Sequence, residues 1–196
     1  MRILTSAALV LLTTACSGPT VISTDDGAVD AGSPAAPAPT TTRPNNAHLA
    51  NAFDFAAQVD GQTAYYFVSP SGRWECSIVP RVRAACQNAQ SATRIGVTDA
   101  PAEVPGPDGE PTAPNAIVVD RTGEPQFAAL PSPGVALEPG PATELPFNRI
   151  LAVAGFRCNI QEATGISCLS DLSGKAFTFS AEGFITAYTD VPATAP

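Results

Sequence analysis

Two matched pairs of cysteines constrain the fold of this chain more than any other feature of its sequence. Nine residues separate Cys76 from Cys86, and nine separate Cys158 from Cys168. In both units an aromatic residue stands two positions before the first cysteine and an isoleucine two positions after it. Because successive side chains of a strand point to opposite faces, this spacing places the aromatic ring, the cysteine and the isoleucine on one face. We therefore predict two similar β-hairpins whose cysteines face each other.

The alternation continues through both strands of each predicted hairpin. The inward set of the first strands is Trp74, Cys76 and Ile78 in one unit and Phe156, Cys158 and Ile160 in the other. The inward set of the return strands is Val82, Ala84 and Cys86, and then Ile166 and Cys168. Apart from Ala85, the residues between them are polar, charged or glycine, which is typical of strands with one buried face.

Four cysteines allow three connectivities, and the sequence alone does not choose among them. The repeat favours local pairing, because directly opposed strand residues lie within reach of a disulfide. The alternatives are free buried thiols and a zinc site. Zinc ligands usually come in pairs two to four residues apart, and an exported chain favours oxidised cysteines.

The matched units also indicate an internal duplication with an indel. Gly72 precedes its cysteine by four residues, whereas Gly155 precedes Cys158 by three. A solenoid needs at least three repeats. We therefore expect a mainly β fold: one small disulfide-stapled domain with two pseudo-symmetric halves.

The remaining cysteine, Cys16, lies at the end of an N-terminal apolar run. Met1-Arg2 and the apolar residues that follow are too short to span a bilayer and are typical of a signal peptide, here residues 1–15. The sequence up to Cys16 resembles the lipobox of bacterial lipoproteins, although Thr13 stands where an aliphatic residue is usual. The resemblance implies cleavage before Cys16 and lipid attachment to its sulfur. An ordinary secretory signal would instead leave an unpaired thiol in an exported protein.

Residues 16–48 are rich in Ser, Thr, Pro and Ala and contain too little apolar surface to fold. We predict a disordered tether there, a β-rich domain over residues 49–190 and a tail over residues 191–196. His48, the only histidine, is predicted to be a solvated residue at the edge of the tether. Residues 40–42 are threonines beside prolines, which suits either O-glycosylation or an unmodified linker.

Inside the domain the pattern predicts short elements joined by turns and proline-rich loops. The predicted elements are a short helix over 49–57 and strands over 62–68, 93–98, 115–119, 126–130, 149–154, 175–180 and 184–188, besides the two hairpins. Residues 69–72 have proline and glycine at positions that fit a type I turn. Phe147, at the end of the proline-rich stretch 131–146, is predicted to pack on the core.

Charge and composition exclude several functions. The net charge of −8 disfavours binding to nucleic acid or to an anionic membrane surface. A single histidine leaves no histidine cluster for a metal, and Ser69 has no well-placed histidine as a base. Residues 108–110 lack the spaced carboxylates of a calcium loop. We therefore expect no cofactor, no metal site and no catalytic residues.

Residues 67–76, Phe-Val-Ser-Pro-Ser-Gly-Arg-Trp-Glu-Cys, resemble the F-x-S-P-S-G-N-x-x-C opening of small exported actinobacterial proteins of unknown function. Several of these are mycobacterial-type lipoproteins. The segments 165–168 and 174–180 resemble later parts of the same group, and the resemblance spans roughly residues 63 to 188. Arg73 replaces the usual asparagine, and a second glycine before Phe177 is missing. The resemblance implies export and disulfides but transfers no catalytic residue.

These observations favour a non-enzymatic lipoprotein of the cell envelope, held to the outside of the cell membrane by a lipid on Cys16. Its domain would bind an unknown envelope ligand or protein. The alternative is a secreted protease inhibitor that presents residues 79–83 on a loop stiffened by a disulfide. A glycosidase-like enzyme would need a carboxylate pair, which the sequence does not identify.

Overall fold

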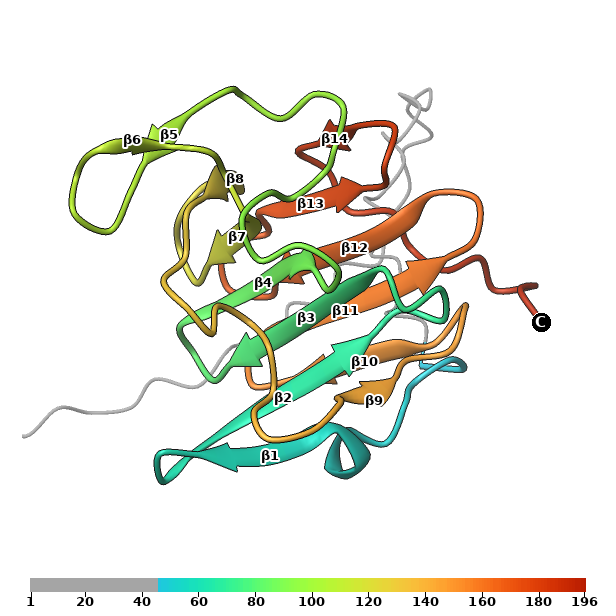
Figure 1. Ribbon diagram of the computed structural model, residues 1–196. Helices are drawn as coiled ribbons and strands as arrows, with labels where there is room; N and C mark the ends of the chain where they lie inside the picture. Colours follow the sequence, from blue (N-terminus) through green and yellow to red (C-terminus); the bar gives the residue numbers. More distant parts are fainter. Residues whose placement is uncertain (1–45) are drawn as a thin grey trace, which may run out of the picture. The chain divides into compact units, whose positions relative to one another are not determined.

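The computed structural model describes residues 46–196, which form two β-sheets packed face to face (Figure 1). The N-terminal sheet contains, in spatial order, β1 (Ala56–Val59), β2 (Gln62–Val68), β3 (Trp74–Val79), β4 (Arg83–Asn88), β7 (Ala116–Asp120) and β8 (Gln126–Ala128), with β9 (Thr143–Glu144) parallel to the end of β2. The C-terminal sheet contains β10 (Ile150–Val153), β11 (Phe156–Gln161), β12 (Gly165–Ser170), β13 (Ala176–Phe179) and β14 (Phe184–Ile185).

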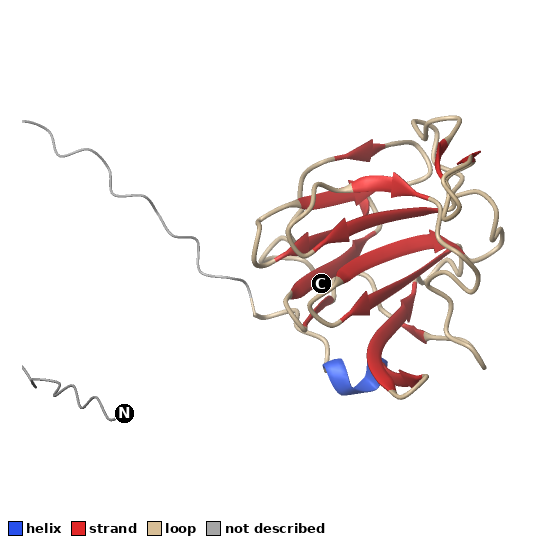
Figure 2. Cartoon of the chain, turned by 90° about the vertical axis from the view of Figure 1, so that its left-hand side faces the viewer, coloured by secondary structure: helices blue, strands red, loops and turns tan. Residues whose placement is uncertain are grey.

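Two smaller elements lie outside the sheets. β5 (Val104–Pro105) and β6 (Pro111–Thr112) form a hairpin that projects at the upper left of Figure 1. Ala52–Phe55 forms a 3₁₀ helix, drawn in blue in Figure 2. Residues 46–196 contain no α-helix. The predicted mainly β, disulfide-stapled domain is therefore confirmed.

Both predicted cysteine hairpins are present. Cys76 on β3 lies directly opposite Cys86 on β4, and Cys158 on β11 lies opposite Cys168 on β12. The paired Cα atoms are 4.0 and 4.1 Å apart, and each pair forms a disulfide. Local pairing is thus confirmed, and a zinc site at these cysteines is excluded.

The duplication extends to five successive strands of each sheet. β2, β3, β4, β7 and β8 follow one another in the N-terminal sheet as β10 to β14 do in the C-terminal sheet. Their registers correspond, since Cys86 lies opposite Ile117 and Cys168 lies opposite Phe177. The fold is therefore two copies of one antiparallel meander, packed against each other.

The halves differ in the connection between their first two strands. Residues 69–73 join β2 to β3, and the Gly72 N–H donates to the Ser69 carbonyl at 2.8 Å, which closes the predicted turn. Only Ala154 and Gly155 join β10 to β11, with φ angles of 56° and 90°. Two positive φ values are typical of the tight turns that suit the twist of a hairpin. The difference in glycine spacing that predicted an indel lies at this connection, where the two loops differ in length.

One apolar core lies between the sheets and contains both disulfides. Trp74 is 7% exposed and Phe156 is fully buried, so both predicted inward faces are correct. The Trp74 ring packs edge to face on Phe179 of the other sheet, with centroids 5.0 Å apart. Burying one large apolar side chain stabilises a fold by about 1.5–3 kcal/mol. Other buried members are Phe67, Ile78, Ile117, Val119, Leu151, Ile160, Ile166 and Phe177.

Irregular segments cover the outer faces of both sheets. The proline-rich strap, residues 131–136, crosses the N-terminal sheet, where the Val135 N–H donates to Gln87 Oε1 at 3.1 Å. The C-terminal strap, residues 186–191, crosses the C-terminal sheet, where Asn159 Nδ2 donates to the Thr189 carbonyl at 2.9 Å. Several strands are therefore buried on both faces.

The predicted helix over residues 49–57 is wrong beyond one turn. The 3₁₀ helix Ala52–Phe55 begins after Asn51, whose side chain accepts a backbone N–H two residues further on. Ala56–Val59 continues as β1 because its residues pair in register with β2. Tertiary pairing has overridden the helical spacing of the apolar residues.

The strand predicted over residues 93–98 is also absent. Ile95 and Val97 are buried, as a strand would have them, but Gly96 between them has a φ of 74°. A left-handed residue breaks an extended run. The segment therefore contributes two core side chains without joining a sheet.

Three further expectations need correction. Val82 is 53% exposed, because it belongs to the turn that follows β3 and not to β4. Leu145, which is fully buried, takes the core position predicted for Phe147, and Phe147 is 40% exposed. The last strand ends at Ile185, since the chain then turns into the C-terminal strap.

Candidate functional site

A cleft of about 420 Å³ opens at one end of the sandwich, where four turns meet. Residues 80–82 and 121–125 come from the N-terminal sheet, and residues 154–155 and 171–175 come from the C-terminal sheet. We call this site the arginine cleft. It is lined by Arg81, Arg121, Ala154, Gly155, Phe156, Asp171 and Leu172.

Hydrogen bonds between the two sheets hold the turns of the arginine cleft in place. The Arg81 N–H donates to the Ala154 carbonyl at 3.1 Å. The Ser170 hydroxyl donates to the Arg121 carbonyl at 2.7 Å. Because each bond joins a turn of one sheet to a residue of the other, the cleft is preformed. A preformed site loses little conformational entropy when a ligand binds.

The turn that carries Arg81 follows from its local sequence. The Val82 N–H donates to the Val79 carbonyl at 3.0 Å, so residues 79–82 form a β-turn. Pro80 fixes φ at the second position, and Arg81 has a φ of 59° at the third, as a type II turn requires. The disulfide of the same hairpin fixes the strands on either side.

Arg81 and Arg121 are cations without an acidic partner. Asp171, the only acid in the lining, lies 3.8 Å from the guanidinium of Arg157. Within residues 46–196 the guanidinium groups of Arg81 and Arg121 make no ion pair and no hydrogen bond. Both residues are exposed. Two uncompensated positive charges thus stand at one cleft of a chain whose net charge is −8.

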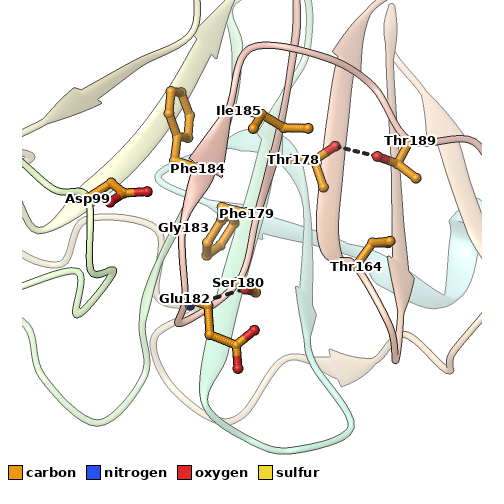
Figure 3. Close-up of a pocket in the computed structure, with 10 residues that line it drawn as sticks. All are labelled: Asp99, Thr164, Thr178, Phe179, Ser180, Glu182, Gly183, Phe184, Ile185 and Thr189. Atoms are coloured by element: carbon orange, nitrogen blue, oxygen red, sulfur yellow. Dashed lines mark hydrogen bonds between the residues drawn. The ribbon is translucent and has the colours of Figure 1, made fainter.

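A second cleft, of about 390 Å³, lies at the opposite end of the strands (Figure 3). Some of its polar groups hold the fold. The Thr178 hydroxyl donates to the Ala187 carbonyl at 2.7 Å and lies 3.0 Å from the Thr189 hydroxyl. The Asp99 carboxylate lies so close to Gly183 that an added Cβ would be 2.8 Å from its Oδ2. The cleft's two carboxylates, those of Asp99 and Glu182, are in no ion pair within residues 46–196, so this cleft is acidic whereas the arginine cleft is cationic.

The four cysteines predicted as disulfide sites, Cys76, Cys86, Cys158 and Cys168, lie inside the core and away from solvent. Their role is to fix the two hairpins. Cys16, predicted to carry the lipid, lies outside the described residues.

Ser69 and His48 both have structural positions. The Ser69 hydroxyl is buried and accepts the Trp74 N–H at 3.0 Å, which agrees with the turn interpretation. The prediction that His48 is solvated is wrong, because this side chain is 8% exposed and its Nε2 has no partner. Its carbonyl accepts the Ile150 N–H at 2.8 Å, so the segment before the helix is bound to the edge of β10.

The loop proposed for a protease inhibitor is a tight turn. Its central residue, Arg81, is left-handed, and its N–H is already bonded to Ala154. The Val82 carbonyl accepts the Arg121 N–H at 2.9 Å. A peptide that adds a strand to a partner needs an extended backbone with free main-chain groups, and this turn offers neither.

Within residues 46–196 no group of three or more His, Cys, Asp or Glu side chains is placed to hold a metal ion. No helix in the described part of the chain is long and apolar enough to cross a membrane.

Sequence reasoning considered Arg81 only for an inhibitor loop and missed Arg121 and Leu172 altogether. Single charged or apolar residues in turns give no signal in one sequence. Antiparallel order does place alternate turns at the same end of a sheet. Counting turns in both halves would therefore have grouped these residues.

The chain matches no family model, no curated protein and no solved structure. Fold and site define the class of protein: a β-sandwich of two repeated meanders, stapled by two disulfides, with a cationic cleft at one end.

Proposed function

We propose that this chain is a non-enzymatic, lipid-anchored protein of the cell envelope whose domain binds a ligand in the arginine cleft. The proposal rests on the guanidinium groups of Arg81 and Arg121. They have no acidic partner and lie beside apolar surface in a preformed cleft. A volume of about 420 Å³ lies within the roughly 300–1,000 Å³ that is typical of small-molecule sites.

The chemistry of the cleft supports binding more than catalysis. A guanidinium stays protonated at all relevant pH values, so Arg81 and Arg121 are poor general acids or bases. The one carboxylate of the lining, Asp171, is paired with Arg157. Catalysis would most need a nucleophile or a base, such as Ser69 or His48. Both residues lie at the end of the sheets opposite the arginine cleft.

The anchor is proposed from the sequence around Cys16, where an apolar run ends in a lipobox-like segment. Cys16→Ala should release the protein from the membrane fraction or leave an unprocessed precursor. Fractionation with mass spectrometry of the N-terminus measures both. Unchanged membrane retention of a processed chain would contradict the anchor.

Binding can be tested before the ligand is known. The chain from Ser17 onward retains the whole core and both disulfides, so it can be labelled with ¹⁵N and titrated with a charge-balanced panel of small acids, amines and neutral molecules. We expect the amide signals of Gly155 and Leu172 to shift with some members of the panel. If no molecule of any charge shifts these signals, the cleft is not a binding site.

A further inference from the structure

We infer that the arginine cleft binds an anionic amphiphile, that is, one carboxylate or phosphate group carried on a short apolar chain. This inference rests on the proposed function and names the ligand class of the same site. It follows from the charges left unpaired at this end of the sandwich and from the apolar side chains exposed beside them.

The acid that lines the cleft and an acid of the neighbouring β7–β8 turn are already neutralised. Asp171 pairs with Arg157, and Glu124 of the β7–β8 turn pairs with Lys175 of the β12–β13 turn. Asp120, opposite Arg83 where β4 pairs with β7, is in no ion pair within residues 46–196, but it does not line the cleft. Arg81 and Arg121 are left over, and a guanidinium group binds carboxylate or phosphate oxygens through paired N–H donors. The free charges therefore select an anion.

The apolar part of the ligand follows from the walls. Leu172, in the lining, is 60% exposed, and Val82, in the same turn as Arg81, is 53% exposed. Ala154, which also lines the cleft, adds to this apolar surface. Exposed aliphatic side chains next to unpaired cations fit a ligand that has an apolar chain and a negatively charged group. A purely polar anion would leave Leu172 in water.

Matched eight-carbon probes test the head group alone. Octanoate, octyl phosphate, octylammonium and octanol share a chain and differ only in the head. The labelled chain from Ser17 onward is titrated with each probe, below its critical micelle concentration, and the shifts of Gly155 and Leu172 are followed. We expect octanoate or octyl phosphate to bind about tenfold more tightly than octanol, and octylammonium most weakly. Comparison of the two anions distinguishes a carboxylate ligand from a phosphate ligand.

Variants then assign the two halves of the ligand to residues. Arg81→Gln with Arg121→Gln should weaken anion binding by about tenfold, the amount expected when charge-assisted hydrogen bonds are lost. Leu172→Ser should weaken all four probes alike, since it removes an apolar contact. Arg94→Gln is the control. Arg94 is exposed, lies outside this cleft and is in no ion pair, so its substitution should change nothing.

Three results would overturn the inference. Octylammonium or octanol binding as tightly as the anions would show a cleft without charge selection, which leaves the proposed binding function standing. Unchanged anion affinity in the double arginine variant would place the anion elsewhere. Binding only to phosphatidylglycerol vesicles, with none of the eight-carbon probes shifting Gly155 or Leu172, would make this end a membrane-contacting surface.

Discussion

At the scale of single residues, Tyr188 is the clearest source of pH dependence in the fold. It belongs to the C-terminal strap, and its hydroxyl is buried without a hydrogen-bond partner. Burial raises the pKa of this hydroxyl from 10.0 to about 12; the nearby Asn159 side chain lowers the pKa in part, and the charge of Asp190 raises it further. In the unfolded chain the same group titrates near its ordinary pKa of about 10. Between pH 10 and 12 the unfolded state therefore loses a proton that the folded state keeps.

Rising pH should consequently destabilise the fold through Tyr188. The contribution is fully present below pH 10 and is lost towards pH 12, and it amounts to roughly 2–3 kcal/mol. We expect Tyr188→Phe to remove this alkaline loss. At neutral pH the variant should be at least as stable as the unaltered protein, since the hydroxyl it removes has no partner. Urea midpoints at pH 8 and pH 11 measure both effects, and an equal alkaline loss in the variant would contradict the assignment.

At the scale of elements, the alternation of apolar and polar residues predicts which faces of the strands are buried. The inward faces of β3 and β11 and the local disulfides follow from the spacing of Trp74, Cys76, Phe156 and Cys158. The straps over the outer faces do not follow, because they are held by side-chain bonds to the backbone, as Gln87 holds the proline-rich strap. Such bonds have no periodicity that a single sequence reveals.

The arginine cleft as a whole could not be predicted from the sequence, for a related reason. Its residues come from four turns that are far apart in the sequence, and their proximity follows from how the two meanders pack. The sequence indicates a duplication, but it does not tell how one copy lies on the other. Strand order places Arg81 and Arg121 at one end of the N-terminal sheet, but only the tertiary structure shows that Asp171 and Leu172 of the C-terminal sheet lie beside them.

The start of β12 depends on a glycine for two separate reasons. Gly165 has a φ of 89°, and a Cβ added there would collide with the Phe179 backbone carbonyl. Gly155 has almost the same φ, 90°, but an added Cβ would meet nothing within 4 Å. Comparing alanine at these two positions therefore separates backbone strain from the collision.

We expect Gly155→Ala to cost about 1–2 kcal/mol, the usual penalty for a left-handed residue with a side chain. Gly165→Ala should cost about 1–3 kcal/mol more, since a backbone carbonyl cannot move aside as a flexible side chain can. Denaturant midpoints of the two variants measure the difference. Equal losses would mean that β13 shifts to accept the extra methyl group.

At the scale of the whole molecule, the two halves share one core and should behave as one cooperative unit. The core contains residues of both sheets, and the Trp74 ring of the N-terminal sheet rests on Phe179 of the C-terminal sheet. Each half has its own disulfide, yet neither sheet buries its inner face without the other. The two similar meanders thus form one folding domain. A substitution that destabilises one half should also destabilise the other.

This cooperativity can be measured because Trp74, the only tryptophan, reports on one half. Phe156→Ala removes a fully buried ring from the other half and should cost roughly 3–5 kcal/mol, as should Trp74→Ala. That is a large part of the roughly 5–15 kcal/mol that stabilise a typical domain. We expect Phe156→Ala to lower the denaturant midpoint of Trp74 fluorescence as much as that of far-UV circular dichroism, since a two-state domain unfolds as a unit.

The control for this experiment is Phe53→Ala. Phe53 is 89% exposed, so its truncation should change stability by no more than about 0.5 kcal/mol. Reduction of both disulfides should weaken the domain by about 2–5 kcal/mol for each bond and move Trp74 emission to the red as the core opens. If Phe156→Ala instead lowered the circular dichroism midpoint and left the fluorescence midpoint unmoved, the two meanders would unfold separately. The shared core would then be a contact between two domains, and the turns of the arginine cleft would lose the rigid support that a preformed site requires.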